Sequence, residues 1–333
     1  MSEIASVGIR IAITGTGAYL PERVLTNDDL STMVDTSDEW IQARTGMRER
    51  RIAREDEATS DMGAVAATRA LESAGVDAAE VDLIIVATCT PDMIFPSTAC
   101  HIQELIGAKN AFCFDLSAAC SGFLYGIETA RGMITSGVYK TVLVIGAEKM
   151  SSITDWEDRG TCILFGDGAG AAVLQAGDEG HGIMSTVMGS DGSLGDLLKL
   201  PAGGSRTPAS AQTVEDRLHF TKMGGNQVFK HAVLCMSEAG QKALDLAGLE
   251  IADVDWVIPH QANMRIINAI AERAEVPLEK LCVNLERVGN LSGASVPVVL
   301  DEAVRDGRIK RGDIILFVVF GAGFTWGAMV LQW

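Results

Sequence analysis

The sequence is poor in basic and aromatic residues. Its 333 residues include 27 lysines and arginines against 44 aspartates and glutamates, which gives a formal net charge of −17 at pH 7. Such an excess of negative charge argues against a nucleic-acid-binding protein, and any acidic partner would need a local basic patch. Aromatic residues make up 5% of the chain, whereas 47% of residues are hydrophobic and 35 are glycines. This composition favours an α/β protein with closely packed helices and sheets.

The sequence also lacks the signals of secretion, membrane insertion and metal binding. No apolar stretch reaches the length of a membrane-spanning helix, and the N-terminus has no apolar region typical of a signal peptide. The seven cysteines are scattered and mostly lie within apolar runs, and no pair has the spacing of a zinc site. We therefore expect a cytoplasmic protein with reduced thiols and no metal.

One cysteine differs from the others in its local sequence. Cys120 follows an apolar run at residues 112–114 and precedes a helical pattern over residues 124–134. This pattern predicts a tight strand-to-helix turn, where unpaired N–H groups and the helix dipole favour the nucleophilic thiolate. Small residues at 117–122 would let a substrate approach closely. For an isolated cysteine a buried structural role is the usual alternative, so the choice depends on the rest of the chain.

Hydrophobic periodicity predicts alternating strands and helices in the first half of the chain. The expected elements are strands over 9–14 and 81–88 and helices over 58–74 and 97–106. Gly15 and Gly17 are interpreted as a turn, because the third glycine of a dinucleotide-binding fingerprint is missing. The glycine-rich bend at 163–170 lacks the lysine of a phosphate loop, so we attribute its glycines to close packing. Residues 177–213, rich in glycine and polar residues, are assigned to a connector.

Segments of the first half recur in the second half in the same order. The matching pairs are 71–82 with 244–255, 113–116 with 282–285, and 171–175 with 328–332. Each match alone is weak, but a conserved order of repeats is typical of internal duplication. We therefore predict a duplicated α/β unit with halves at residues 1–176 and 177–333.

The duplication predicts that three polar side chains meet where the two halves join. Asn290 lies in the second-half block that corresponds to the block of Cys120, and His260 follows the predicted strand over 254–258. A thiol, an imidazole and a carboxamide can provide a nucleophile together with neutral donors for an oxyanion or enolate. A histidine at a strand end is more often structural, but the symmetry favours a catalytic role for His260.

Four motifs occur in order along the chain. They are DLSAACSGF at 115–123, PHQAN at 259–263, GNLSGASVP at 289–297 and GAGFTWG at 321–327. In sequence and separation these motifs resemble those of 3-oxoacyl-acyl-carrier-protein synthase III. The resemblance implies a thiolase-like, five-layered αβαβα fold, usually as a homodimer. It also implies a decarboxylative condensation of an acyl-CoA primer with malonyl-acyl-carrier protein, which gives 3-oxoacyl-carrier protein, CoA and CO2 and initiates fatty-acid synthesis.

The resemblance also implies a role for each matching residue. Cys120 would accept the acyl group, and His260 and Asn290 would promote decarboxylation. The backbone N–H groups of Cys120 and Ala322 would form the oxyanion hole, although many members have glycine where this chain has Ala322. No metal or redox cofactor is implied, because the coenzyme A thioester is itself a substrate. The remaining positions form a coenzyme A site (Trp40, Arg44, Arg159, Asn263), an acyl pocket (Phe320, with Phe95 from across a dimer) and a carrier-protein docking face (Lys230, Arg265, Arg273).

Other enzyme classes share part of this pattern. A priming ketosynthase of a specialised pathway would use the same three groups. A type III polyketide synthase would also use them but takes its extender from coenzyme A, whereas the predicted docking face favours a carrier protein as the source. A biosynthetic thiolase needs a second catalytic cysteine near the C-terminus, but no cysteine follows Cys282. Papain-like proteases share the order of cysteine, histidine and asparagine but have a different nucleophile motif. A binding module without activity would be expected to have lost one of the three groups.

Overall fold

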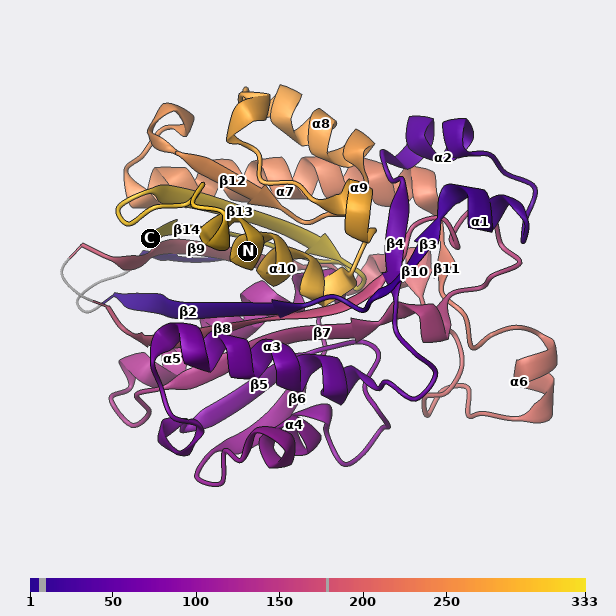
Figure 1. The fold of residues 1–333 in the computed structure, drawn as a ribbon. Coiled ribbons are helices and arrows are strands. Elements are labelled where there is room, and N and C mark those ends of the chain that lie inside the picture. Colours follow the sequence, from indigo (N-terminus) through magenta and orange to yellow (C-terminus); the bar gives the residue numbers. More distant parts are fainter. Residues whose placement is uncertain (6–9, 178–179) are drawn as a thin grey trace.

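The computed structural model describes residues 1–5, 10–177 and 180–333. Two five-stranded sheets are stacked with helices between them and on both outer faces (Figure 1). This order of layers is the five-layered α/β architecture that the sequence predicts. Within the described ranges, no helix is both long and apolar enough to cross a membrane.

The two sheets repeat one topology. The first sheet has the order β2 (Ile11–Tyr19), β8 (Asp167–Ala176), β7 (Val142–Lys149), β5 (Leu83–Ala87) and β6 (Phe112–Leu116). The second sheet has the order β1 (Ser2–Ala5), β9 (Gly182–Ser190), β14 (Thr325–Gln332), β13 (Ile314–Gly321) and β12 (Trp256–Pro259). Strand β5 runs parallel to β6 and β7, and β12 runs parallel to β13 and makes a parallel bridge at Leu281. The other neighbours are antiparallel, so β9, β14, β13 and β12 repeat β2, β8, β7 and β5.

Helices fill the layers around these sheets (Figure 1). Helices α5 (Gly122–Thr135) and α10 (Ser295–Arg305) lie between the sheets, where apolar side chains from both sheets and both helices form a shared core. The outer layers are α3 (Thr59–Ala74) and α4 (Thr98–Ile106) on the first sheet, and α7 (Gly225–Ala247) and α8 (Met264–Arg273) on the second. Helix α3 ends where Gly75 adopts φ 65°, as the sequence predicts.

Shorter elements lie near the ends of the strands. They are β3 (Arg23–Thr26), β4 (Glu49–Ile52), β10 (Leu198–Lys199), β11 (Lys222–Met223), α1 (Asn27–Ser31), α2 (Asp38–Thr45), α6 (Ala211–Glu215) and α9 (Leu285–Val288). Short 3-10 turns are η1 (Ala78–Glu80), η2 (Ala119–Ser121), η3 (Met150–Ile153), η4 (Gly192–Leu197), η5 (Ile251–Asp253), η6 (Leu278–Lys280) and η7 (Ser292–Ala294). Two of these turns, η2 and η7, directly precede the central helices and position the candidate site.

The predicted turn at Gly15 and Gly17 is wrong. Both glycines lie inside β2, which continues to Tyr19, while Ile9 of the predicted strand lies outside the described residues. A Cβ atom added at Gly15 or Gly17 would lie 2.5 or 2.3 Å from a backbone carbonyl oxygen of α3. The glycines therefore serve close packing of strand against helix rather than chain reversal.

Close packing also explains a glycine of the 163–170 bend, as predicted. Gly170 lies in β8, and an added Cβ atom would lie 2.7 Å from Cβ of Pro297 in α10. The assignment of residues 177–213 to a connector is wrong in part, because residues 182–190 form β9. This strand pairs with β14 along its length and has β1 on its other side.

Candidate active site

A cavity of about 380 Å³ lies where the two halves meet. Its lining includes Cys120, His260 and Asn290, the three groups that the duplication predicts to converge. Cys120 and Asn290 are 170 positions apart in the sequence, with His260 between them, so it is the fold that brings these residues together. A concave site with a few polar groups among apolar walls is typical of small-molecule binding.

Cys120 lies in turn η2, directly before α5. The turn is sharp, since Ala119 adopts φ 46°, a left-handed conformation that non-glycine residues rarely adopt. Gly321 at the end of β13 packs against this turn, and a Cβ atom added there would lie 2.7 Å from the Cys120 backbone nitrogen. The predicted strand-to-helix turn is therefore present.

The thiol of Cys120 is in its protonated form in this setting. Burial raises the pKa of Cys120 to about 12, although a hydrogen bond with the Ser292 hydroxyl acts in the opposite direction. The sequence suggested that the start of the helix would favour the thiolate, whereas desolvation favours the protonated thiol. Nucleophilic attack by Cys120 therefore requires that its proton be removed during the reaction.

His260 follows β12 and is held by its backbone, whose N–H donates to Val318 O at 2.8 Å. Its side chain is buried, and Nδ1 has no hydrogen-bond partner within the described chain. Burial lowers the pKa of His260 to about 4, because desolvation disfavours the charged imidazolium. The imidazole is therefore neutral at physiological pH and can offer one N–H donor.

Asn290 is fixed by backbone contacts with the first half of the chain. Its N–H donates to Leu164 O at 2.8 Å, and its carbonyl accepts from Gly166 N at 3.1 Å. The side-chain Oδ1 accepts from Ser292 N at 2.8 Å. Since this contact occupies the amide oxygen, the amide NH2 is the group that can donate to a bound ligand.

The sequence analysis missed two residues, of which Ser292 contacts Cys120 and Glu148 lies one contact further away, bonded to Cys89 and Gly293. Ser292, in turn η7, adopts φ 49°, as Ala119 does in the equivalent turn, and its Oγ lies 3.5 Å from Cys120 Sγ. Glu148, at the end of β7, is completely buried and accepts hydrogen bonds from residues 88–90. The acid that directly follows the apolar run 142–147 was the signal that could have identified Glu148.

The residues predicted to hold coenzyme A form an aromatic-guanidinium stack at the cavity. Two guanidiniums lie over the ring of Trp40 in α2, with Arg44 Cζ at 4.6 Å and Arg159 Cζ at 4.5 Å from the ring centroid. Trp40, Arg44 and Asn263 line the cavity. Arg159 lies beside it, where Nη1 donates to Asp35 O at 2.7 Å. Such a stack offers a planar surface and positive charge, which suit a nucleotide.

The remaining predicted residues have different positions. Phe320 and Ala322 line the cavity, and Ala322 is not among the described residues with positive φ, so alanine fits the backbone there. Phe95 does not line the cavity and is 82% exposed in the single chain. Asn263 Oδ1 also caps α8 by accepting from Ile266 N at 3.0 Å.

The three predicted docking residues are exposed on the outer helices of the second half. Lys230 lies in α7, and Arg265 and Arg273 lie in the first and last turns of α8. Arg265 also lines the cavity, and its Cζ lies 5.8 Å from the Phe229 ring centroid. Arg273 is eight residues further along the helix, a distance of about 12 Å.

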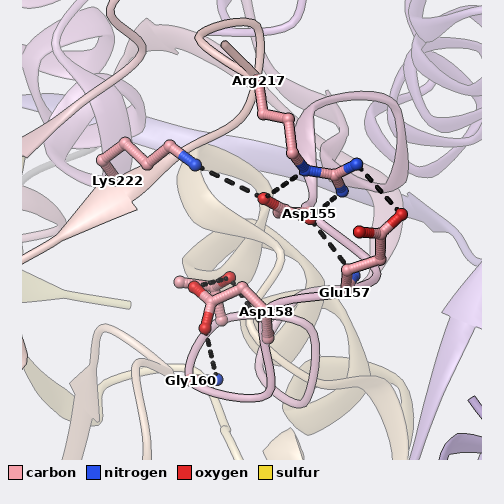
Figure 2. Close-up of polar contacts among 7 residues, drawn as sticks. Asp155, Glu157, Asp158, Gly160, Arg217 and Lys222 are labelled. Atoms are coloured by element: carbon pink, nitrogen blue, oxygen red, sulfur yellow. Dashed lines mark hydrogen bonds and ion pairs between the residues drawn. The ribbon is translucent and has the colours of Figure 1, made fainter. Parts of the chain in front are cut away.

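Figure 2 shows an ion-pair cluster around Asp155, which lies next to residues of one wall of the cavity. The wall comprises residues 198–200 with Thr221 and Met223, and Arg217 lies in the segment that connects them. Arg217 forms an ion pair with Asp155 and another with Glu157 at 3.0 Å, and Lys222 lies 3.3 Å from Asp155. The hydrogen bond from Arg217 lowers the pKa of Asp155 to about 2. This cluster fixes the connecting segment to the loop that carries Arg159.

Sequence and structure comparisons identify relatives over the whole chain. Residues 114–192 match the family described as 3-oxoacyl-[acyl-carrier-protein (ACP)] synthase III, and residues 244–333 match its C-terminal family. A β-ketoacyl-[acyl-carrier-protein] synthase III of Desulfitobacterium hafniense is 55% identical over 325 residues, which is 98% of each chain. One from Caldanaerobacter subterraneus is 54% identical, with the same coverage.

A solved structure has the same fold. The 3-oxoacyl-[acyl-carrier-protein] synthase III of Aquifex aeolicus is 49% identical to this chain and matches with a TM-score of 0.90. The match covers 98% of this chain and 100% of that one. The likeness confirms the thiolase-like fold predicted from the sequence. With full-length identity above half and with both family regions matched, this chain belongs to the 3-oxoacyl-[acyl-carrier-protein] synthase III family of condensing acyltransferases.

Proposed function

We propose that this chain condenses an acyl-CoA primer with malonyl-acyl-carrier protein and thereby initiates fatty-acid synthesis. The observation that supports this most directly is the convergence of Cys120, His260 and Asn290 on one cavity. The stack around Trp40 supplies a surface for the adenine end of coenzyme A beside the same cavity. The products are 3-oxoacyl-carrier protein, coenzyme A and CO2.

In the first half-reaction, the sulfur of Cys120 attacks the thioester carbonyl of the primer. The carbonyl oxygen becomes an oxyanion, for which the backbone N–H groups of Cys120 and Ala322 are the proposed donors. The tetrahedral intermediate then expels coenzyme A and leaves an acyl-enzyme. Gly321 provides the close approach between the two backbone segments that such an oxyanion hole requires.

In the second half-reaction, the malonyl group loses CO2 and leaves an enolate. A neutral His260 and the Asn290 NH2 are suited to hold the enolate oxygen, because neither readily transfers a proton to the carbanion. Each oxyanion-hole donor of this kind contributes roughly 3–4 kcal/mol to lowering a barrier. The carbanion then attacks the thioester at Cys120 and forms the new carbon–carbon bond.

The proposal includes partners and location. Lys230, Arg265 and Arg273 would bind the acidic carrier protein, and their exposure on α7 and α8 supports this assignment. We also propose a cytoplasmic homodimer in which Phe95 enters the acyl pocket of the partner subunit. The reaction needs no metal or redox cofactor, since the thioesters supply both the leaving group and the driving force of decarboxylation.

A priming ketosynthase of a specialised pathway is the second candidate function. The priming β-ketosynthase of the R1128 polyketide biosynthetic pathway is 40% identical to this chain, with a TM-score of 0.90 over 98% of each chain. Both candidates share the chemistry at Cys120 and differ in the primer and in the pathway that uses the product.

Intact-protein mass spectrometry tests the proposed function. The purified chain is mixed with a panel of acyl-CoAs and then treated with malonyl-acyl-carrier protein. We expect a mass gain that maps to Cys120 and is discharged as 3-oxoacyl-carrier protein, and the best-loading acyl group would identify the primer. Discharge by malonyl-CoA alone would favour a polyketide synthase, and a chain that no acyl-CoA loads would contradict the proposal.

Two variants separate the half-reactions. Cys120→Ala should abolish acyl transfer, because the nucleophile is missing. His260→Ala should still become acylated but should decarboxylate malonyl-carrier protein about 100 to 1,000 times more slowly, the usual effect of losing one oxyanion donor. Loss of acylation in His260→Ala would contradict this division of roles.

A further inference from the structure

The proposed first half-reaction leaves one requirement open, which is a group that accepts the proton of Cys120. Desolvation raises the pKa of the half-buried Cys120 thiol to about 12, so attack by its sulfur requires that the proton move to another group. His260 is assigned to the second half-reaction. Within the described chain, the side-chain hydrogen bond of Cys120 is with Ser292, at a distance of 3.5 Å between Sγ and Oγ.

A row of hydrogen bonds leads from Cys120 to a buried carboxylate. Ser292 Oγ lies 3.6 Å from Cys89 Sγ, and Cys89 Sγ donates to Glu148 Oε1 at 3.2 Å. The three contacts can all point in one direction, with Cys120 S–H toward Ser292, Ser292 O–H toward Cys89, and Cys89 S–H toward Glu148. The row joins four elements from both halves of the chain: η2, η7, the turn after β5, and β7.

Glu148 is held as an acceptor at the end of this row. Its carboxylate accepts from the backbone N–H groups of Cys89 at 3.1 Å and Thr90 at 3.1 Å, and from Thr90 Oγ1 at 2.6 Å. The Gly293 N–H, at 3.4 Å, connects it to turn η7. Burial nevertheless raises the pKa of Glu148, so this carboxylate takes up a proton more readily than an exposed glutamate.

The backbone of Ser292 adopts an unusual conformation next to Cys120. A left-handed conformation is rare at a non-glycine residue, and here it occurs at the residue whose hydroxyl contacts Cys120. The Ser292 N–H also fixes the Asn290 side chain. Turn η7 therefore connects the nucleophile, the amide donor and the buried carboxylate.

We propose that Ser292, Cys89 and Glu148 form a proton relay that activates Cys120, with Ser292 as a catalytic residue and the other two as positioning and accepting groups. This inference rests on the proposed function. As Cys120 sulfur bonds to the thioester carbon, its proton passes to Ser292, the Ser292 proton passes to Cys89, and the Cys89 proton passes to Glu148.

The protons balance over the whole reaction. Coenzyme A leaves as a thiolate and takes a proton from water, while Glu148 keeps the relayed proton in the acyl-enzyme. When the carbanion attacks, the Cys120 thiolate is expelled, and the relay runs in reverse to return the proton. The net uptake of one proton from water matches the charge of the malonyl carboxylate, which leaves as neutral CO2.

The relay predicts a distinct pH profile for acylation. The titratable groups that face Glu148 are Cys89, after β5, and Cys120, in η2; desolvation raises the pKa of both thiols, and the negative charge of Glu148 raises it further. Its neighbour Lys149 is directed elsewhere, since Nζ donates to backbone carbonyls at residues 54–57. With the relay, attack does not need prior ionisation of Cys120, whereas without it the rate must follow the thiolate fraction.

The experiment measures single-turnover acylation by acetyl-CoA, with rapid quenching and mass spectrometry, from about pH 6 to pH 9. The variants are Cys89→Val, which blocks the row and excludes water, Cys89→Ser, which keeps a donor and acceptor, and Ser292→Ala. Alanine is compatible with the backbone at 292, because Ala119 has the same conformation in the equivalent turn. Cys235→Val, a half-buried thiol in α7, is the matched control, and circular dichroism checks folding.

We expect Cys89→Val and Ser292→Ala to acylate at least about 100 times more slowly than wild type at pH 7, with rates that rise about tenfold per pH unit. In wild type, Cys89→Ser and the Cys235→Val control, the acylation rate should depend less steeply on pH than in these two variants. A wild-type profile in Cys89→Val, or an equal loss in Cys89→Val and Cys89→Ser, would overturn the relay. Failure of wild type to acylate would instead overturn the proposed function, and the relay with it.

Discussion

At the scale of single residues, the space around Cys120 is set by one glycine. A Cβ atom at Gly321 would lie 2.7 Å from Cys120 N and 3.1 Å from Ser121 N, and these backbone atoms cannot move without distorting turn η2. Gly321→Ala should therefore slow acylation about 100-fold or more, the usual effect of a disturbed oxyanion hole. Single-turnover acylation by acetyl-CoA measures this effect.

The neighbouring position supplies the control. Ala322 has an ordinary backbone conformation, so Ala322→Gly should acylate at a rate close to that of wild type. An equal loss in both variants would mean that any change in this loop is damaging, and the steric explanation for Gly321 would fail.

Burial of His260 predicts how stability depends on pH. The pKa of the folded imidazole is about 4, and that of an unfolded histidine is near 6.5, so the unfolded state binds more protons between these values. The contribution of His260 to the free energy of unfolding is therefore fully present above pH 6.5 and is lost as the pH drops toward 4. At about pH 5 this loss amounts to roughly 2 kcal/mol.

Urea denaturation of wild type and His260→Gln at pH 7.5 and at about pH 5 measures this contribution. Glutamine does not titrate, so the variant should lose about 2 kcal/mol less than wild type over the same interval. The acidic groups are the same in both proteins and cancel in the comparison. Equal losses would show that the imidazole is protonated in the folded state.

The sequence predicted catalytic residues where a local motif and the internal repeat pointed to the same position. Cys120, His260 and Asn290 could be identified because each occupies a matching place in the two halves, and the structure brings all three to one cavity. Ser292 and Glu148 could not be identified in this way. Their contacts depend on a turn with positive φ and on packing between β5, β7 and η7, for which neighbouring residues give no signal.

At the scale of elements, the ion-pair cluster around Asp155 (Figure 2) is expected to hold the cavity wall formed by residues 198–200, Thr221 and Met223. Arg217→Gln removes the ion pairs to Asp155 and Glu157 and should loosen the segment between these two parts. We expect the KM for acetyl-CoA to rise about fivefold, a modest effect typical of a partly exposed ion pair, with little change in kcat.

Limited proteolysis provides a second measurement of the same segment. Cleavage between residues 201 and 216 should be faster in Arg217→Gln than in wild type. Arg308→Gln is the control, because Arg308 has two ion pairs of its own, with Glu302 and Asp306, outside the cavity lining. An unchanged KM and an unchanged cleavage pattern in Arg217→Gln would show that the cluster does not position this wall.

Elements were predictable where hydrophobic periodicity was long and uninterrupted, as in α3 and α4. Strand β9 was missed because glycine and serine interrupt its apolar residues, and its pairing partners β1 and β14 are distant in sequence. The glycines of β2 were misread for a related reason. Their purpose is contact with α3, and strand propensity depends more on such tertiary contacts than on local sequence.

At the scale of the whole molecule, the repeat predicted two equivalent sheets, and the topology repeats as expected. One strand departs from this division. β1 comes from the first five residues of the chain, yet it pairs with β9 at the edge of the second sheet. A strand of four residues has no local signal for such a distant partner, so the sequence repeat could not reveal it. The proposed division at residue 176 remains a prediction.

The single chain exposes apolar side chains that favour self-association. Ile94 and Phe95 are 81% and 82% exposed in the loop before α4, and Phe112 is 41% exposed on the edge strand β6. An apolar loop and an unpaired strand edge are unfavourable in water unless a partner covers them. If Phe95 enters the acyl pocket of a partner subunit, one substitution should affect both assembly and primer choice.

Phe95→Asp should therefore shift the proposed dimer toward monomer, with a dissociation constant raised at least about tenfold, as for a buried aromatic anchor. Sedimentation velocity over a range of concentrations measures this shift. Leu278→Asp is the matched control, since Leu278 is also exposed, at 63%, but lies in η6 beside the second sheet. A wild-type monomer at micromolar concentration would refute the dimer, and equal shifts in both variants would remove Phe95 from the interface. A second variant, Phe95→Ala, tests the acyl pocket by the relative loading of short and long acyl-CoAs. If this variant changes assembly but not the relative loading, Phe95 belongs to the interface and not to the acyl pocket.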